Sequence, residues 1–278
     1  MTAEIDREIP PGSDRYSHFG GESAYWLHSF TEVFQRTTGR PADAEFALNA
    51  AAGARRNALR SGLTIVYDKT YPPSTTDYTP IVRAIQATNP DIVFVGSYPP
   101  DSVGMVKAAS EVGLKTKMFG GGMVGLQFAM IQKNLGPMLN NIVNYDFWVP
   151  ESTLKFKGVE EFLAKYQEAA KGKGVDPYGH YLPPYAYAYL QVLGQSVEAT
   201  KSLDHAKLAK HMREATFDTV VGKVKFGRNG EWARTRVLQV QFRDVQPDNL
   251  QQFAGPGKRV VLYPKEWKSG DLVYPYKQ

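Results

Sequence analysis

Residues 90–119 decide the fold class, and they read PDIVFVGSYPPDSVGMVKAASEVGLKTKMF. The run at 92–95 is continuously apolar, which is typical of a strand covered on both faces. A helix is predicted over 100–112, where Gly113 follows as a stop signal, and a short strand is predicted at 116–119. Because strands joined by a helical crossover run parallel, this stretch predicts a β-α-β unit of a parallel sheet.

The same alternation continues on both sides of this unit. Helical periodicity and β-branched runs predict helices at 44–60, 78–87 and 124–134, and strands at 63–67 and 141–147. Asp43 is predicted to cap the first of these helices. The series predicts a doubly wound α/β domain with a parallel sheet.

The pattern changes after Pro150. Three helices are predicted, at 158–171, 183–200 and 204–215. Two strands at 219–226 and 237–242 flank an Asn-Gly turn, which is a strong hairpin signal. A last strand is predicted at 259–263, after a loop at 247–257.

Composition excludes several classes of protein. The 278 residues are 42% hydrophobic and 22% charged, which is ordinary globular usage and allows one large domain or two modest ones. No run of 18 apolar residues is present, and the first 14 residues have no apolar core of a signal peptide. The absence of cysteine excludes disulfides, thiolate nucleophiles and iron–sulfur clusters. The five histidines have no metal-ligand spacing, so no metal site is predicted.

The net charge of +5 does not indicate a nucleic-acid partner. The basic residues of the last quarter are spread singly and form no block of five or six. Zinc-finger spacing, an RNP-like aromatic run and a helix-turn-helix signature are all missing from the sequence.

A glycine-rich stretch offers the sharpest enzyme hypothesis. Residues 120–125 match GxGxxG, and Asp146 lies near the end of the next predicted strand, where a dinucleotide fold places its ribose-binding acid. The alternative interpretation is a tight turn at the end of a strand, because the preceding residues include two lysines instead of a buried apolar run. Residues 152–155 match SxxK without the companion motifs of Ser-Lys acyl transfer. No catalytic residue and no cofactor are predicted, and a nucleotide-dependent oxidoreductase stays the enzyme alternative.

Aromatic residues gather at the ends of the predicted strands. Tyr98 directly follows the 92–95 run, and Tyr145 lies near the end of the 141–147 strand. In an open parallel sheet, ligands bind in the crevice beyond the carboxyl ends of the strands. We therefore expect Tyr98 to face that crevice, where its ring can stack on an apolar or cationic group.

Residues 70–125 resemble the second lobe of type I solute-binding proteins, the leucine-binding-protein family that serves branched-chain and hydrophobic amino-acid ABC transporters. The resemblance continues through IVNYDFWVPE (142–151), YLPPYAYAYLQVLGQSVEAT (181–200) and TVVGKVKFGRNGE (219–231). It covers nearly all of residues 43–243. It implies two α/β lobes, joined by three crossovers, that close on a solute.

The resemblance also implies a set of ligand-binding residues. Phe46 matches an aromatic residue that covers the solute, and Tyr98 matches the aromatic residue after the strand. Gly122 stands where the family commonly has an acid for the solute's α-ammonium group. Either Asp146 supplies that acid here, or the solute is an aromatic or aliphatic carboxylate without an ammonium group. With Tyr145, these residues form the predicted site.

Set against the family, the sequence predicts an incomplete first lobe. The expected division is a first-lobe remnant at 1–40, the second lobe at 41–148, helices returning to the first lobe at 149–217, and a second-lobe hairpin with a tail at 218–278. The resemblance also implies an apolar strand before the 44–60 helix, and this strand has no counterpart in the sequence. We expect exposed apolar helix faces at 158–171 and 183–200 that favour self-association, and a weakened affinity for the solute.

The function implied by the resemblance is that of a non-enzymatic solute-binding component. It would bind an amino-acid-like or aromatic carboxylate between two lobes and deliver it to ABC permease subunits. The family location is the periplasm, although the sequence as given would be cytoplasmic if complete. A cytoplasmic small-ligand sensor on the same fold is the alternative.

Overall fold

The computed structural model describes residues 45–72, 74–227, 230–234 and 236–276. The side chains of Glu45 and Phe46 lie outside this description, so it does not place the predicted solute contact of Phe46. The predicted cap Asp43 also lies outside the described residues.

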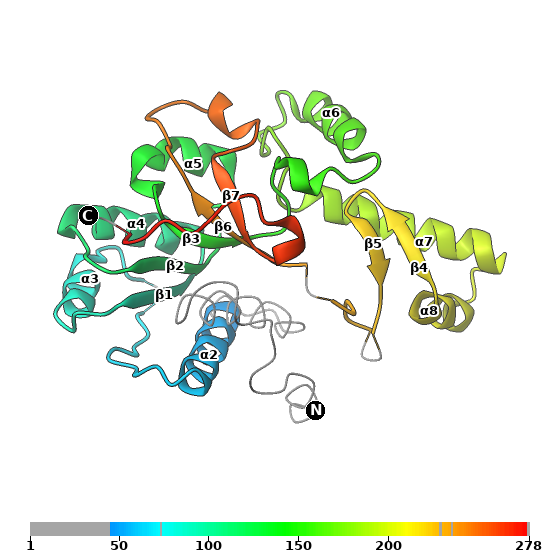
Figure 1. The fold of residues 1–278 in the computed structure, drawn as a ribbon. Helices are drawn as coiled ribbons and strands as arrows, with labels where there is room; N and C mark the ends of the chain where they lie inside the picture. The colour runs from blue at the N-terminus through cyan, green and yellow to red at the C-terminus, as the bar shows by residue number, and fades with distance from the viewer. Residues whose placement is uncertain (1–44, 73, 228–229, 235, 277–278) are drawn as a thin grey trace.

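A five-stranded mixed sheet forms the centre of the molecule (Figure 1). Its spatial order is β1-β2-β3-β6-β7. The first three strands run parallel to one another, whereas β6 and β7 are antiparallel additions. Their bounds are β1 Ile92–Ser97, β2 Met118–Met123, β3 Val143–Asp146, β6 Leu238–Phe242 and β7 Arg259–Tyr263.

Helices cover the parallel part of the sheet. One apolar core joins strands β1 and β2 to α3 Thr79–Gln86, α4 Pro99–Val112 and α5 Ala129–Leu135. The helix α4 begins at a proline, which needs no hydrogen-bonded N–H there, and ends at Gly113 in the left-handed conformation at φ 68°. The helix α2 Glu45–Arg60 lies beside β1.

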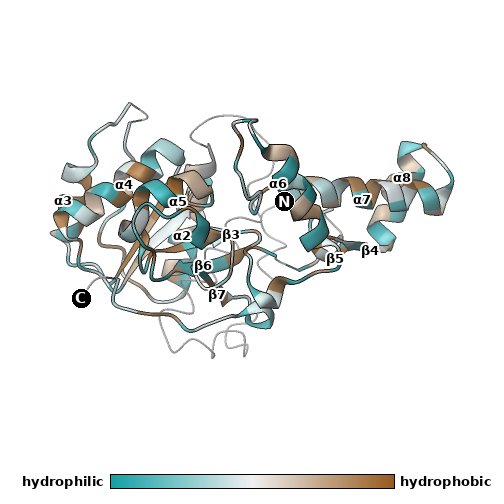
Figure 2. Cartoon of the chain, turned by 90° about the horizontal axis from the view of Figure 1, so that it is seen from above, coloured by the Kyte–Doolittle hydropathy of each residue, from teal (hydrophilic) through white to brown (hydrophobic). Residues whose placement is uncertain are grey.

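A second group of elements is inserted between β3 and β6. It contains three helices and a two-stranded ribbon: α6 Val159–Ala170, α7 Pro183–Thr200, α8 His205–Glu214, β4 Thr216–Thr219 and β5 Gly222–Lys225. Helix α7 extends away from the sheet (Figure 2). A second apolar core joins this group to β6 and β7. Short 3-10 turns complete the fold: η3 Gly136–Leu139, η4 Ser152–Leu154, η5 Gln251–Phe253 and η6 Lys265–Trp267.

The structure confirms most of the predicted helices. The helices expected at 44–60, 78–87, 100–112, 158–171, 183–200 and 204–215 are present to within a residue or so at each end. The helix expected at 124–134 begins later, at Ala129. No helix in the described part of the chain is both long and apolar enough to cross a membrane.

Two strand predictions are wrong. The β-branched segment 63–67 forms no strand, because it has no sheet partner among the described residues. The predicted hairpin of 219–226 with 237–242 does not form either. Instead β4 pairs with β5 through a tighter turn, and β6 is inserted between β3 and β7. Phe226 and Trp232 form an isolated antiparallel bridge outside these strands.

Candidate functional site

The carboxyl ends of β1, β2 and β3 meet at one edge of the sheet and bring four of the five predicted site residues into one region. Tyr98 follows β1 as the half-buried cap residue of α4. Gly122 is buried near the end of β2, opposite Gly96 of β1. Tyr145 and Asp146 end β3 and are both buried, at 1% exposure.

The glycine-rich stretch is a strand and does not form the predicted turn. Gly120 and Gly121 lie inside β2, with φ of 151° and 149°. A Cβ on Gly121 would lie 2.2 Å from the carbonyl oxygen of Val95 in the neighbouring strand, so glycine permits the close approach of the two backbones. This corrects the dinucleotide-loop hypothesis as well, because the stretch does not open directly into a helix.

Five aromatic rings, here called the aromatic rim, gather at the end of β3 and just beyond it. They are Phe128, Tyr145, Phe147, Tyr181 and Tyr185. Phe147 and Tyr181 stack with their centroids 5.3 Å apart and their planes 9° apart, and Phe128 meets Tyr181 edge-on at 5.8 Å. The hydroxyl oxygens of Tyr145 and Tyr181 lie 2.6 Å apart, in hydrogen-bond contact. Such offset and edge-on pairs are the favoured geometries of aromatic contact.

The aromatic rim is uncharged at neutral pH. Burial raises the pKa of the Tyr145 phenol well above its usual value, and the neighbouring Tyr181 phenol adds to this. Burial likewise raises the pKa values of Tyr181 and Tyr185. The rim therefore consists of aromatic rings and neutral hydroxyl groups, which suit apolar or aromatic surroundings.

Asp176 fixes the loop that carries Tyr181. One of its carboxylate oxygens accepts from the backbone N–H of Ala129, the first residue of α5, at 2.7 Å. The other accepts from the N–H groups of Tyr178 and Gly179, at 3.0 and 2.9 Å. The loop before α7 is thus attached to the start of α5, which sets where Tyr181 lies.

Asp146 is part of a buried charged group and does not stand open beside the aromatic rim. Its carboxylate lies 3.2 Å from Arg259 Nη1 of β7, and both side chains are at most 2% exposed. Arg259 Nη2 donates to His180 Nδ1 at 2.7 Å, which leaves the imidazole proton on Nε2. Burial raises the pKa of Asp146 to about 6, against the lowering effect of Arg259. Burial, with Arg259 as a further cause, lowers the pKa of His180 well below its usual value, so the ring is neutral.

Polar side chains hold the strand ends in place. Gln127 accepts from the N–H of Gly125 at 2.9 Å and donates to the carbonyl of Tyr145 at 3.0 Å. The Asn144 amide accepts from the N–H of Met123 and donates to its carbonyl, both at 3.0 Å. These contacts fix the edge on which the aromatic rim rests.

Sequence reasoning missed Phe128, Gln127 and the role of Tyr181. Tyr181 precedes a Pro-Pro pair at a helix start, which was the one available hint of a fixed position. No periodic pattern marks Phe128. Within the described residues, no group of three or more His, Asp or Glu side chains could hold a metal ion.

Comparison with known proteins identifies the family. The family model described as periplasmic binding protein matches residues 41–246. Leu/Ile/Val-binding protein homolog 8 of Brucella abortus (strain 2308) is 25% identical over 229 residues, covering 80% of this chain and 53% of that protein. Homolog 7 of Brucella suis biovar 1 (strain 1330) is 25% identical over 242 residues, covering 84% and 56%. The chain thus spans about half the length of these relatives.

Solved structures share the fold. The leucine-, isoleucine-, valine-, threonine- and alanine-binding protein of Brucella ovis, in a closed conformation, matches with a TM-score of 0.63 at 19% identity, covering 89% of this chain and 63% of that one. A solute-binding protein of R. palustris in complex with 4-hydroxybenzoate matches with a TM-score of 0.59 at 18% identity, covering 80% and 65%. The chain therefore belongs to the periplasmic binding protein family, as a type I member of its leucine-binding branch.

Proposed function

We propose that this chain acts as the solute-binding component of an ABC transporter and that the aromatic rim contacts the solute. The observation that supports this most directly is the gathering of the rim at the carboxyl edge of three parallel strands. That edge is where open α/β sheets bind ligands. We assign solute contact to Tyr98, Tyr145, Phe147 and Tyr181, and we keep Phe46 as a proposed contact from the start of α2.

The proposed solute is a small aromatic carboxylate without an ammonium group. Gly122 offers no side chain to such a group, and the charge of Asp146 is already balanced by Arg259. A second ion pair with a solute would require that buried contact to break, which is costly. Two structures from R. palustris with this fold carry benzoate and 4-hydroxybenzoate, which gives the probes for a test.

Titration calorimetry tests this proposal. We expect the protein to bind 4-hydroxybenzoate or benzoate more tightly than leucine or phenylalanine. Tyr181→Ala should weaken the binding about two- to tenfold, because a lost aromatic contact is worth roughly 0.5–1.5 kcal/mol.

A matched variant separates solute contact from general packing. Phe162 and Tyr187 form a stacked aromatic pair at 4.8 Å, between α6 and α7. Phe162→Ala removes a ring of this pair and should leave the affinity unchanged. Equal losses in the two variants, or no heat with any of the four solutes, would refute the assignment of the rim.

The proposed mechanism is closure of two lobes around the solute. Solute that contacts both lobes shifts an open–closed equilibrium toward the closed state, which the permease subunits then recognise. The division proposed from the sequence assigns residues 41–148 to one lobe and 149–217 to helices that return to the other. We place this action in the periplasm.

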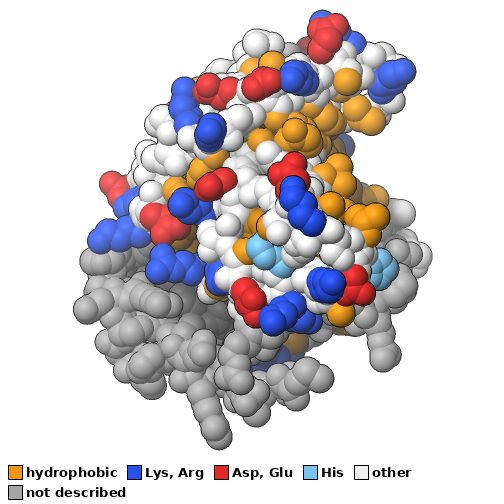
Figure 3. Space-filling view, turned by 90° about the vertical axis from the view of Figure 1, so that its right-hand side faces the viewer, with side chains coloured by type: hydrophobic (Ala, Val, Ile, Leu, Met, Phe, Trp, Pro, Cys, Tyr) orange, Lys and Arg blue, Asp and Glu red, His pale blue; other side chains and the backbone are white. Residues whose placement is uncertain are grey.

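Self-association through α7 is a further expected behaviour. In helix α7, Tyr189 is 74% exposed, Leu190 61% and Leu193 39%. Leu203, just after the helix, is 76% exposed. Hydrophobic side chains gather at this end of the molecule in the space-filling view (Figure 3). Exposed apolar patches commonly mark contact surfaces. Sedimentation velocity should show concentration-dependent dimers that Leu190→Lys abolishes, whereas Leu48→Lys on α2, where Leu48 is 53% exposed, leaves them intact. A purely monomeric protein over the same concentration range would exclude this behaviour.

A further inference from the structure

The carboxylate of the proposed solute needs a cation, and the aromatic rim supplies none. The phenols of Tyr145, Tyr181 and Tyr185 are neutral at pH 7, because burial raises their pKa values. Arg259 lies near this edge of the sheet, but the carboxylate of Asp146 already balances its charge at 3.2 Å. Because a carboxylate that leaves water loses its hydration, the site needs a further positive group.

Arg236 lies near the same edge of the sheet. Strand β6 runs antiparallel to β3, and its first residue, Leu238, pairs with Asp146, the last residue of β3. Arg236 comes two residues before Leu238, so the two Cα atoms are no more than about 7 Å apart. Arg236 and the aromatic rim are therefore both found at the carboxyl edge of β3.

Ring contacts join Arg236 to the aromatic rim. The rim residue Tyr185 meets Phe147 at 5.3 Å and Trp232 at 5.7 Å, measured between ring centroids. The guanidinium carbon of Arg236 lies 5.0 Å from the centroid of the Trp232 ring. Burial raises the pKa of Tyr185, and the charge of Arg236 opposes this rise, so the two groups are within electrostatic reach of each other. A solute ring held at Tyr185 would have this guanidinium beside it.

Three aromatic rings and two carbonyls hold the guanidinium of Arg236 in place. Its carbon lies 5.4 Å from the ring centroid of Phe156, 5.0 Å from that of Trp232 and 4.4 Å from that of Trp267. Nη1 and Nη2 each donate to a backbone carbonyl, one in β5 and one just before it. Rings that face a cation attract it through their quadrupole, so the charge is kept at a fixed position.

The charge of Arg236 has no counter-charge among the described residues. Its contacts there are rings and backbone carbonyls, and none of them is a carboxylate. Nε is buried and has no hydrogen-bond partner. Burial lowers the pKa of Arg236, while Tyr185 and Glu266 oppose this without forming an ion pair, and the side chain stays charged at neutral pH. A partly desolvated cation with an unused donor is unfavourable unless an anion meets it.

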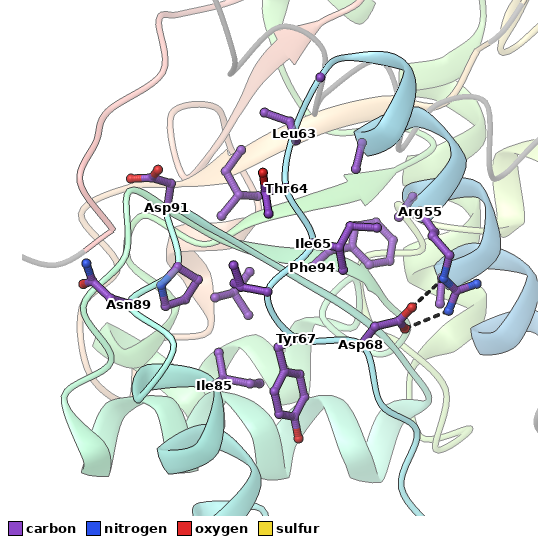
Figure 4. Close-up of a pocket in the computed structure, with 18 residues that line it drawn as sticks. Arg55, Leu63, Thr64, Ile65, Tyr67, Asp68, Ile85, Asn89, Asp91 and Phe94 are labelled. Atoms are coloured by element: carbon purple, nitrogen blue, oxygen red, sulfur yellow. Dashed lines mark hydrogen bonds and ion pairs between the residues drawn. The ribbon is translucent and has the colours of Figure 1, made fainter.

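Arg55 shows how a carboxylate satisfies an arginine in the same chain. It lies beside a cavity next to β1, where its Nε and Nη2 donate to the two carboxylate oxygens of Asp68 at 2.6 and 2.7 Å (Figure 4). Such a bidentate pair is the arrangement in which arginine recognises carboxylates. The side chains of this pair are 43% and 45% exposed, whereas Arg236 is half-buried and has no such partner in the described part of the chain.

We propose that Arg236 binds the carboxylate of the solute and makes the site selective for an anionic aromatic ligand. This assignment rests on the proposed function, because the aromatic rim must hold the ring of the solute. A guanidinium has five N–H groups, and two of those of Arg236 donate to carbonyls, so donors stay available for a carboxylate. The solute would meet Arg236 as Asp68 meets Arg55.

Titration calorimetry with benzoate and benzamide at pH 7 tests this assignment. The two probes share one ring, but only benzoate is charged. We expect the parent chain to bind benzoate at least about tenfold more tightly than benzamide, as one charge-assisted contact provides. Arg236→Met should remove this preference, with benzoate binding at least about tenfold weaker than in the parent and benzamide binding within about twofold of it. Retained benzamide binding also shows that the variant is folded.

Arg243→Met is the matched control. Arg243 is half-buried too, and it donates to the side-chain oxygen of Gln241 and to the carbonyl of Asp271, but it follows β6 at the opposite edge of the sheet. This variant should keep the preference for benzoate. Arg236→Lys keeps the charge without the planar fork, and its affinity for benzoate should lie between those of the parent and Arg236→Met. If Arg236→Met does not fold, the lysine variant decides, and a benzoate affinity equal to that of the parent would then contradict the assignment.

The outcomes separate this assignment from the proposed function. Benzoate binding that Tyr181→Ala weakens and Arg236→Met does not would overturn the role of Arg236 and leave the proposed function in place. No binding of either probe would overturn both. Equal affinity of the parent chain for the two probes would mean that the solute does not balance the charge of Arg236, as when an acid of this chain does so, and would overturn the assignment.

Discussion

Gly120→Ala is expected to prevent the assembly of the sheet. The added Cβ would lie 1.7 Å from the carbonyl oxygen of Val143, which is backbone of the paired strand β3 and cannot rotate away. Alanine is also strained at the φ of 151° that Gly120 adopts. Moving β2 away from β3 to relieve this contact would break the pairing between these two strands. We therefore expect a loss above about 4 kcal/mol, close to the whole stability of many domains. Circular dichroism and urea unfolding of the variant measure it.

Gly194 provides the matched control for this substitution. It lies inside α7, and a Cβ built on it meets nothing within 4 Å. Gly194→Ala should raise the free energy of unfolding by roughly 0.5–1 kcal/mol, because alanine is the better helix former. If Gly120→Ala unfolds at the same urea concentration as the parent chain, the close packing of β2 on β3 is not required for stability.

Arg259→Met is expected to lower the free energy of unfolding by about 3–5 kcal/mol, because it leaves the buried carboxylate of Asp146 without its partner. It also removes the donor to His180 Nδ1. Urea denaturation at neutral pH measures the loss. The exposed pair of Arg55 and Asp68, 43% and 45% exposed, is the comparison, and Arg55→Met should cost no more than about 1 kcal/mol.

A double variant separates charge from packing at this site. Arg259→Met combined with Asp146→Leu removes both charges, and we expect it to be more stable than Arg259→Met alone. A double variant that is less stable than Arg259→Met would show instead that the shape of the Arg259 side chain matters more than its charge.

The helices and the parallel order of strands could be predicted because their causes are local. The Pro-Pro pair at the start of α7 and Gly113 after α4 mark helix ends through the backbone geometry that these residues allow. The segment 63–67 has the same local signals of a strand, yet strand formation needs a partner. Pairing is a property of distant residues, so a β-branched run alone could not decide it.

The glycine-rich stretch is a second case in which the local sequence could not decide whether a strand forms. Glycine is a poor strand former, so residues 120–122 read as a turn. In the structure they lie in β2, because the neighbouring strands β1 and β3 approach β2 too closely for side chains. The predicted hairpin does not form for a related reason, since β6 pairs with the distant strand β3 while β5 pairs with β4.

Part of the candidate site could be predicted from its place along the strands. Tyr98, Gly122 and Tyr145 were placed at strand ends, and parallel pairing brings those ends to one edge. The partner of Asp146 could not be predicted, because Arg259 lies 113 residues further along the chain. Tyr181 was missed as a contact of Tyr145 for the same reason, since its position depends on a loop attached through Asp176.

The insertion of the α6–β5 group between β3 and β6 has a consequence for synthesis on the ribosome. Strand β3 pairs with β6 in the folded sheet. Its last residue, Asp146, is translated 92 residues before Leu238, the first residue of β6. At about 5–20 residues per second, the nascent chain exposes that edge for roughly 5–20 s. During this interval the strand offers unpaired backbone to any other strand nearby. Chaperones that hold nascent chains should therefore affect the yield of this protein more than that of a sheet whose strands are completed in order.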